Sequence, residues 1–247
     1  MRKLYKIYAW LVFAPIMVLS TVFFGAATVL LLFFLPPRQV AILCGKSWAR
    51  VNSYATPMLV TVIGRENVDP DQSYVIVSNH QSQFDIFVLY GWLNIDFKWV
   101  MKQELRKVPV IGVACERLGH IYVDRSNREA ALASINAAKQ RIVDGTSVLF
   151  FPEGTRSRDT HMRPFKKGAF RMALDLQLPI LPITIQGTRD ILPSDTLDLY
   201  PGRATMIIHP PIAIDAYDAA GLDELMARTR EVIAAPGIHA PQPVQKG

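Results

Sequence analysis

Apolar residues are concentrated at the start of the chain. No charged residue occurs between Ile7 and Leu35, and a continuous helix of that length would reach about 44 Å, more than the roughly 30 Å hydrocarbon core of a bilayer. The stretch is also far longer than the about 7–15 apolar residues of a cleaved signal peptide. The pattern therefore predicts an N-terminal hydrophobic helical segment that anchors the protein to a membrane.

An amphipathic pattern follows Pro36 and Pro37. Its apolar residues recur at helical spacing: Val40, Leu43, Cys44, Trp48 and Val51. Lys46 and Arg50 fall on another face, which is typical of a helix at a membrane surface. Basic residues flank both ends of the first apolar stretch, so charge gives no orientation. We expect anchoring in the interface rather than a membrane-spanning segment.

Short apolar runs alternate with helical patterns after residue 60. Six runs predict strands: 74–78, 97–101, 120–123, 147–151, 180–185 and 204–209. The clearest helix runs from Asn127 to Val143. The alternation predicts an α/β fold, a single domain with a mostly parallel or mixed central sheet flanked by helices. Pro179 and Pro182 favour an edge strand or an irregular start for the fifth run.

This pattern divides the chain into three parts. We expect membrane-anchoring helices over 1–60, a catalytic domain over 61–235, and a disordered tail over 236–247, where proline and glycine are frequent. A chain of 247 residues is long enough for one sizeable domain beside the anchor.

Composition narrows the kinds of partner. The net charge is +6, which suits phosphorylated substrates or acidic lipid head groups. We expect no nucleic-acid partner, because no nucleic-acid-binding motif accompanies the charge. Cys44 and Cys115 lack metal-ligand spacing, which predicts two reduced, buried thiols. Reduced thiols in turn indicate that the protein faces the reducing cytosol. His120, His161, His209 and His239 also lack liganding partners at metal spacing, so no metal is expected.

One histidine has the setting of a catalytic base. His80 follows the first predicted strand, and Asp85 lies five residues later. A neutral imidazole can take a proton from an alcohol near neutral pH, and a carboxylate can fix its tautomer. Five residues on one helix would place the two side chains about 140° apart. We therefore expect His80 in a loop and Asp85 in the first helical turn, where it also serves as a helix-terminus carboxylate.

Further candidate residues follow other strands. Glu153, Gly154, Thr155 and Arg156 come directly after the fourth run, and glycine there permits close approach of a ligand to the backbone. The alternative is an ordinary turn with a solvated arginine. Lys102, Arg125 and Arg156 each end or follow a strand, and together they can hold a phosphate monoester. Sites in such sheets gather at the carboxyl ends of strands, so we expect one cleft.

These motifs together resemble the glycerolipid acyltransferase family, and most closely its bacterial lysophosphatidic acid acyltransferases. The resemblance rests on four segments in the family's order: 79–85 with the histidine, four residues, aspartate motif; 119–125; 151–157 with Glu-Gly-Thr; and 178–183. It implies two N-terminal helices that dock the domain on the bilayer. It also implies substrate binding by the Glu-Gly-Thr segment, with Glu153 either facing the glycerol part or holding the basic residues in place.

The resemblance implies an O-acyltransferase of phospholipid biosynthesis at the inner membrane, with its catalytic domain facing the cytosol. It would move a fatty acyl group from acyl-CoA or acyl carrier protein, as a co-substrate, to the 2-hydroxyl of lysophosphatidic acid, giving phosphatidic acid without a further cofactor. Another lysophospholipid, lyso-ornithine lipid or glycerol-3-phosphate stays open as acceptor. A hydrolase of lipid thioesters and a non-catalytic module for anionic membranes are rival classes.

Overall fold

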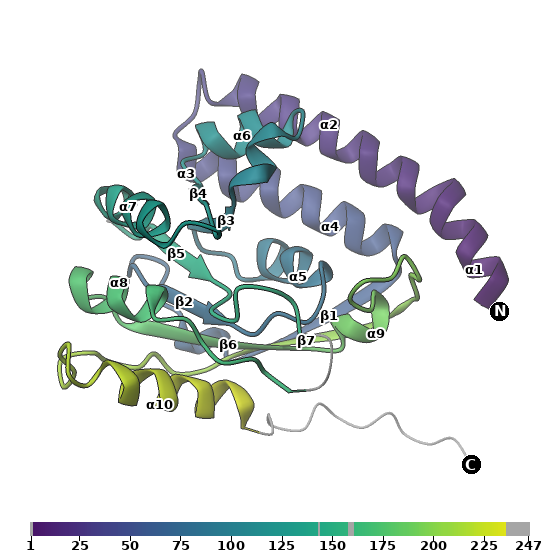
Figure 1. Ribbon diagram of the computed structural model, residues 1–247. Helices are drawn as coiled ribbons and strands as arrows, with labels where there is room; N and C mark the ends of the chain where they lie inside the picture. Colours follow the sequence, from purple (N-terminus) through teal and green to yellow (C-terminus); the bar gives the residue numbers. More distant parts are fainter. Residues whose placement is uncertain (1, 143, 158–160, 236–247) are drawn as a thin grey trace, which may run out of the picture.

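A seven-stranded sheet lies at the centre of the protein, with helices on both of its faces (Figure 1). The computed structural model describes residues 2–142, 144–157 and 161–235. The strands are β1 (Met58–Ile63), β2 (Val75–Ser78), β3 (Phe97–Lys102), β4 (Ile121–Val123), β5 (Ser147–Phe150), β6 (Ile180–Gln186) and β7 (Gly202–Ile208). Their order is β1-β7-β6-β2-β5-β3-β4, and every neighbouring pair is parallel except β6 with β7. The predicted mixed sheet is confirmed.

The six predicted strands are all present, but β1 was not predicted. This strand pairs with β7 at one edge of the sheet and is only partly buried. It directly follows a helix, so the expected boundary between residues 60 and 61 falls inside it. Residues 58–60 therefore belong to the sheet.

The prediction of an edge position for the fifth run was wrong. That run is β6, which lies between β2 and β7 and is almost fully buried. Pro179 precedes the strand, and Pro182 pairs with Val77 of β2. The ladder with β7 begins one residue later, at Ile183, and the Pro182 carbonyl still accepts a hydrogen bond from the His209 N–H (3.0 Å). The missing donor of Pro182 thus falls just beyond the end of a ladder, where a proline is tolerated.

Helices cover both faces of the sheet. The α-helices are α1 (Arg2–Tyr8), α2 (Ala14–Leu31), α3 (Pro37–Val40), α4 (Lys46–Ala55), α5 (Phe84–Trp92), α6 (Ile111–Arg117), α7 (Arg128–Ala138), α8 (Gly168–Leu176), α9 (Thr188–Ile191) and α10 (Leu222–Ala234). The shorter helical turns are η1 (Ala9–Phe13), η2 (Ala41–Gly45), η3 (Arg65–Asn67), η4 (Gln103–Lys107) and η5 (Lys139–Arg141). Helices α4 and α5 lie on one face, and α8 and α10 lie on the other (Figure 1).

The predicted helix over 127–143 is shorter than expected. Asn127 is its N-cap, and the Asn127 side chain accepts hydrogen bonds from the backbone N–H groups of Glu129 and Ala130. The α-helix ends at Ala138 and tightens into η5, while Val143 and the predicted tail over 236–247 lie outside the described residues.

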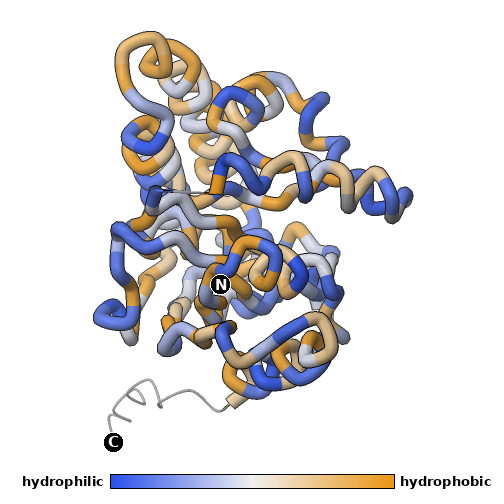
Figure 2. Tube along the Cα trace, turned by 90° about the vertical axis from the view of Figure 1, so that its left-hand side faces the viewer, coloured by the Kyte–Doolittle hydropathy of each residue, from blue (hydrophilic) through white to orange (hydrophobic). Residues whose placement is uncertain are grey.

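The N-terminal helices form a hairpin on the catalytic domain. Tyr5–Leu31 is one apolar helical stretch, and an 18-residue window within it has a mean hydropathy of 2.1, so it is long and apolar enough to cross a membrane. The second helical stretch begins at Pro37, as expected. The hydrophobic turn between them is at the top of the molecule in Figures 1 and 2. Near the other end of the first stretch, the hydroxyl groups of Tyr5 and Tyr8 donate to the Thr56 and Ala55 carbonyls (2.6 and 2.7 Å). The long helix is therefore attached to the domain along its length.

Candidate active site

His80 and Asp85 form a hydrogen-bonded pair beside the carboxyl end of β2. His80 lies in the loop after the strand, and Asp85 lies in the first turn of α5. The His80 Nδ1 is 2.8 Å from Asp85 Oδ2. The expected break between loop and helix is present. In the neutral imidazole, the nitrogen that faces the carboxylate, Nδ1, carries the proton, and Nε2 then has a free lone pair.

Asp85 is held rigidly from several sides. Its side chain is 0% exposed. Besides His80, Oδ2 accepts the backbone N–H groups of Gln81 and Ser82 (2.7 and 2.9 Å), and Oδ1 accepts the Thr188 hydroxyl (2.5 Å). Buried carboxylates need such donors to stay charged. The cluster fixes the orientation of the carboxylate that in turn fixes the His80 ring.

Glu153 supports the loop that carries His80. It is 4% exposed, and its Oε1 accepts the backbone N–H of His80 (2.9 Å). Its Oε2 accepts the Ser157 hydroxyl and the Arg163 backbone N–H. The structure thus places Glu153 behind the histidine, with both carboxylate oxygens engaged. Its role in substrate binding stays a prediction.

The turn after Glu153 is bonded to the segment that follows β4. Gly154 has a φ of +75°, a left-handed conformation that favours glycine. The Gly154 carbonyl accepts a hydrogen bond from the exposed Arg125 guanidinium. Arg125 follows β4, whereas Thr155 and Arg156 continue the turn after β5. The segments that follow β4 and β5 therefore meet at the carboxyl ends of these strands.

A cavity of about 520 Å³ begins at these strand ends. The predicted site residues that line it are His80, Lys102, Arg125, Thr155 and Arg156. The rest of its wall is mainly apolar and comes from α2, α4, α5, β3 and α6. Its volume lies within the range of about 300–1,000 Å³ that is usual for ligand sites. Asp85 and Glu153 lie behind this surface, and Gly154 shapes the turn.

Two side chains that contact the His80–Asp85 pair were missed by sequence reasoning. The Phe151 ring stacks on the imidazole at a centroid distance of 3.9 Å, and Thr188 binds Asp85. Phe151 directly follows β5 and lies two residues before Glu153, so its position at a strand end was a usable signal. Thr188 follows a Gly after β6, in the same arrangement as Thr155 after β5. Within the described ranges, no group of His, Cys, Asp and Glu side chains is suited to a metal ion.

Comparisons with known proteins show the family to which this fold belongs. A family model described as Acyltransferase matches residues 59–186. A 1-acyl-sn-glycerol-3-phosphate acyltransferase of Chlamydomonas reinhardtii is 37% identical over 178 residues, covering 71% of this chain and 52% of that protein. A chloroplastic 1-acyl-sn-glycerol-3-phosphate acyltransferase of Brassica napus is 39% identical over 170 residues, covering 68% and 48%. The chain thus spans about half the length of these curated relatives.

A solved structure extends the likeness to the N-terminal helices. The 1-acyl-sn-glycerophosphate acyltransferase PlsC of Thermotoga maritima superposes with a TM-score of 0.81 at 28% identity, covering 94% of this chain and 95% of that one. The family model covers the strands and turns that hold His80, Asp85 and the Glu-Gly-Thr segment. With more than half of its residues matched, and with these residues set around one cavity, this chain belongs to the acyltransferase family.

Proposed function

We propose that this protein transfers a fatty acyl group from a thioester donor to the 2-hydroxyl of lysophosphatidic acid, forming phosphatidic acid. The single observation that carries the proposal is the cavity, which combines an imidazole with a free ring nitrogen, three cations and an apolar interior. A phosphorylated lipid alcohol matches all three features. The names of the curated relatives support the same acceptor.

The chemistry follows from the ring nitrogen that Asp85 leaves free. Nε2 of His80 takes the proton from the acceptor hydroxyl while its oxygen attacks the thioester carbonyl. Asp85 stabilises the imidazolium that forms. Collapse of the tetrahedral intermediate breaks the carbon–sulfur bond, and the imidazolium returns the proton to the departing thiolate. The acceptor supplies the nucleophile, so no acyl-enzyme is needed.

Lys102, Arg125 and Arg156 bind the acceptor phosphate. All three border the cavity with His80, and each ends or follows a strand. Arginine offers a bidentate fork to phosphate oxygens, and lysine offers a point charge. Arg156 has Asp195 3.9 Å away, which holds the guanidinium near the site before substrate arrives. The glycerol hydroxyl then lies within reach of the imidazole.

The apolar part of the cavity receives an acyl chain. Phe24 and Gly25 of α2, Trp48 of α4 and Ala114 of α6 contribute to its wall. Because α2 also carries exposed hydrophobic residues on its outer side, the cavity lies directly beneath the surface from which a lipid arrives. Burial of each methylene contributes about 0.8 kcal/mol, so a long chain is bound strongly.

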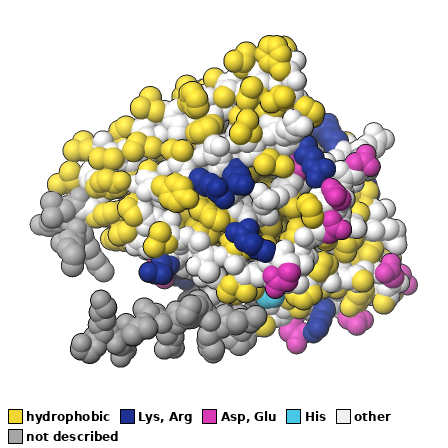
Figure 3. All heavy atoms as spheres, turned by 180° about the vertical axis from the view of Figure 1, so that it is seen from behind, with side chains coloured by type: hydrophobic (Ala, Val, Ile, Leu, Met, Phe, Trp, Pro, Cys, Tyr) yellow, Lys and Arg dark blue, Asp and Glu magenta, His cyan; other side chains and the backbone are white. Residues whose placement is uncertain are grey.

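The N-terminal hairpin lies in one leaflet of the membrane. Exposed residues along it include Leu11, Val18, Phe23, Phe33 and Phe34, and Figure 3 shows a hydrophobic band over α1 and α2 with basic side chains below it. Because the polar domain packs against this helix along its length, the helix could cross the bilayer only if the domain entered the hydrocarbon core as well. We place the domain on the cytosolic face of the inner membrane, where acyl-CoA and acyl carrier protein are found.

Product analysis with an acceptor panel tests the proposal. Purified protein receives a labelled acyl thioester and lysophosphatidic acid, glycerol-3-phosphate, a lyso-ornithine lipid or a neutral lysophospholipid. We expect labelled phosphatidic acid as the main product by mass spectrometry. Faster transfer to another acceptor would replace lysophosphatidic acid. Free fatty acid formed equally without acceptor would identify a hydrolase instead.

A further inference from the structure

The segment between β6 and β7 bonds to the loops that form the proposed site. It comprises α9 and the turn after it, residues 188–195, and none of the sequence motifs falls in it. The Thr188 hydroxyl donates to Asp85, and the Leu192 carbonyl accepts the Ser82 hydroxyl (2.7 Å). A segment distant in the sequence thus holds the loop after β2 at two places.

Ser194 contacts two of the site's loops with one hydroxyl group. Its Oγ lies 2.9 Å from the Gln81 carbonyl oxygen and 3.2 Å from the Ser157 carbonyl oxygen. Gln81 directly follows His80, and Ser157 directly follows Arg156. One side chain therefore joins the neighbour of the base to the neighbour of a phosphate-binding arginine.

The two carbonyl groups depend on this hydroxyl as their donor. The hydroxyl of Ser194 carries one proton, which the two carbonyl oxygens share. Without it, two partial negative charges would lie near each other with no donor between them. Ser157 is only 2% exposed, so solvent is a poor substitute for the lost donor. Removal of the hydroxyl is therefore expected to let the two loops move apart.

The position of Arg156 depends on the same turn. The loops are joined once directly, because the Ser157 N–H donates to the His80 carbonyl (2.8 Å). That bond holds the backbone of the base. Asp195, the residue after Ser194, lies 3.9 Å from the Arg156 guanidinium. The turn that carries Ser194 therefore acts on the backbone beside the arginine and on its side chain.

We propose that Ser194 is a positioning residue that sets the distance between the base His80 and the phosphate held by Arg156. The proposal rests on the proposed function, since it takes Arg156 as a phosphate-binding residue. A phosphorylated acceptor is held at its phosphate and reacts at its hydroxyl, so both ends fit only when this distance is correct. An acceptor without a phosphate gains nothing from it. Ser194 thereby contributes to the preference for phosphorylated acceptors.

Matched acceptors test this role. The probes are lysophosphatidic acid and the monoacylglycerol with the same acyl chain, which lacks the phosphate. Ser194 is only half-buried, so Ser194→Ala should remain folded. We expect it to lower the preference for lysophosphatidic acid about 3- to 10-fold, in the dissociation constants measured without donor and in kcat/KM. The KM for the donor should stay unchanged, and Ser194→Thr, which keeps the hydroxyl, should retain the preference.

A double-mutant cycle with Arg156→Ala separates positioning from a structural role. If Ser194 acts through the arginine, Ser194→Ala should cause no further loss of preference in protein that already lacks the guanidinium. A structural defect would instead lower binding and transfer of both acceptors to the same degree.

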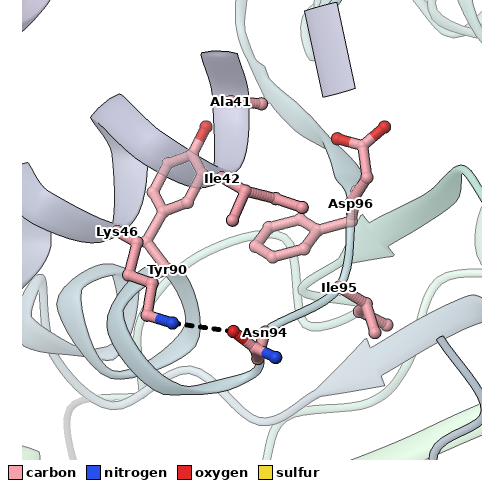
Figure 4. A pocket seen from close by; sticks show the side chains of 8 residues that line it. Ala41, Ile42, Lys46, Tyr90, Asn94, Ile95 and Asp96 are labelled. Atoms are coloured by element: carbon pink, nitrogen blue, oxygen red, sulfur yellow. Dashed lines mark hydrogen bonds between the residues drawn. The ribbon is translucent and has the colours of Figure 1, made fainter. Parts of the chain in front are cut away.

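Two control variants each remove a side-chain hydrogen bond elsewhere. Thr196 bonds within its own loop, to Pro193 and Asp198, and Thr196→Val removes these bonds. Asn94 lies beyond the C-terminal end of α5 and accepts from Lys46 (2.8 Å) beside a separate small cavity (Figure 4). Asn94→Gly suits the local φ of +64°. Both controls should keep the preference of the wild type.

Three results would overturn the proposal. They are a wild-type preference in Ser194→Ala by both measures, an additive loss in the double variant, and an equal loss in Thr196→Val or Asn94→Gly. The proposed function is judged separately, by whether the wild type forms phosphatidic acid. If it does not, the dissociation constants of the two lipids still decide the role of Ser194.

Discussion

At the scale of single residues, the site depends on side chains that hold other side chains. His80 is oriented by Asp85, and Asp85 is oriented by two backbone N–H groups and Thr188. The backbone of His80 is itself held by Glu153. In such a chain of hydrogen bonds, loss of a distant member shifts the base by a fraction of an ångström, and this lowers the rate without removing a reacting group.

Thr188→Val tests this hydrogen-bond chain. Valine has the shape of threonine but cannot donate to Asp85, so we expect kcat to fall about 3- to 30-fold with little change in KM for either substrate. Thr188→Ser, which keeps the hydroxyl, should recover most of the rate. Steady-state kinetics in detergent micelles would show this. A kcat for Thr188→Val equal to that of the wild type would remove Thr188 from the positioning of the base.

His120 makes stability depend on pH. Burial, together with the nearby Lys98 ammonium, lowers its pKa to about 3 in the folded protein, against a pKa near 6.5 when unfolded. Between these values the unfolded chain binds a proton that the folded chain does not, so folding stability is lost as pH falls from about 6.5 towards 3. We expect this loss to be up to about 1.4 kcal/mol per pH unit. The unfolding midpoint of wild type and His120→Asn should converge as pH falls, and parallel curves would contradict the assignment.

The His80–Asp85 pair was predictable from sequence, whereas the contacts of Thr188 and Glu153 that hold it in place were not. A histidine after an apolar run and an aspartate five residues later are local signals. The segment 153–156, directly after another apolar run, is an equally local signal. Thr188 reaches Asp85 across 103 residues of sequence, which no spacing rule reports. Glu153 was expected near substrate or the basic residues, because nothing in its neighbourhood shows that both oxygens bind the backbone and hydroxyl groups of the loop.

At the scale of elements, strands were easier to predict than their order. Six apolar runs have strand-like composition, and that property is local. The position of β6 between β2 and β7 depends on pairings with distant segments, and Pro182 suggested an edge because the ladder end at Ile183 was unknown. The partly exposed β1 was missed for a related reason, since its partner β7 lies at the other end of the domain.

The contact between α2 and α6 is an element-scale feature with a measurable consequence. A Cβ at Gly25 would lie 2.2 Å from the Val110 side chain, so glycine lets the two elements meet beside the acyl cavity. We expect Gly25→Ala to lower the thermal midpoint by several degrees through this clash. Because Val110→Ala removes the clashing methyl groups, the double variant should regain part of the loss. A purely additive double variant would show that the contact is unimportant.

At the scale of the whole molecule, the hairpin and the cavity share one side. The outer surface of α2 is apolar, its inner surface lines the cavity, and the cations border the polar end. Nearby, the Arg117 guanidinium lies 5.7 Å from the Phe33 ring, a position suited to lipid head groups. Under the proposed function, this arrangement would let a lysolipid enter with its chain in the bilayer and its phosphate at the surface.

Vesicle binding tests the role of this surface. Leu11, Phe23 and Phe34 are exposed on or beside the long helix, and their combined replacement by serine should reduce sedimentation with vesicles of phosphatidylglycerol and phosphatidylcholine at least about tenfold. Leu59→Ser, at an exposed site on β1 outside the hairpin, is the control. Equal loss by the control, or full binding by the triple variant, would contradict the assigned membrane surface.

The most direct measurement is the rate of phosphatidic acid formation by purified His80→Ala. The assay supplies lysophosphatidic acid in mixed micelles together with a labelled donor, either acyl-CoA or acylated acyl carrier protein. The product is quantified by mass spectrometry. We predict a loss of at least about a hundredfold against wild type, with vesicle binding and folding retained. Turnover within tenfold of the wild type, in protein that is folded and membrane-bound, would contradict the assignment of His80 as the base.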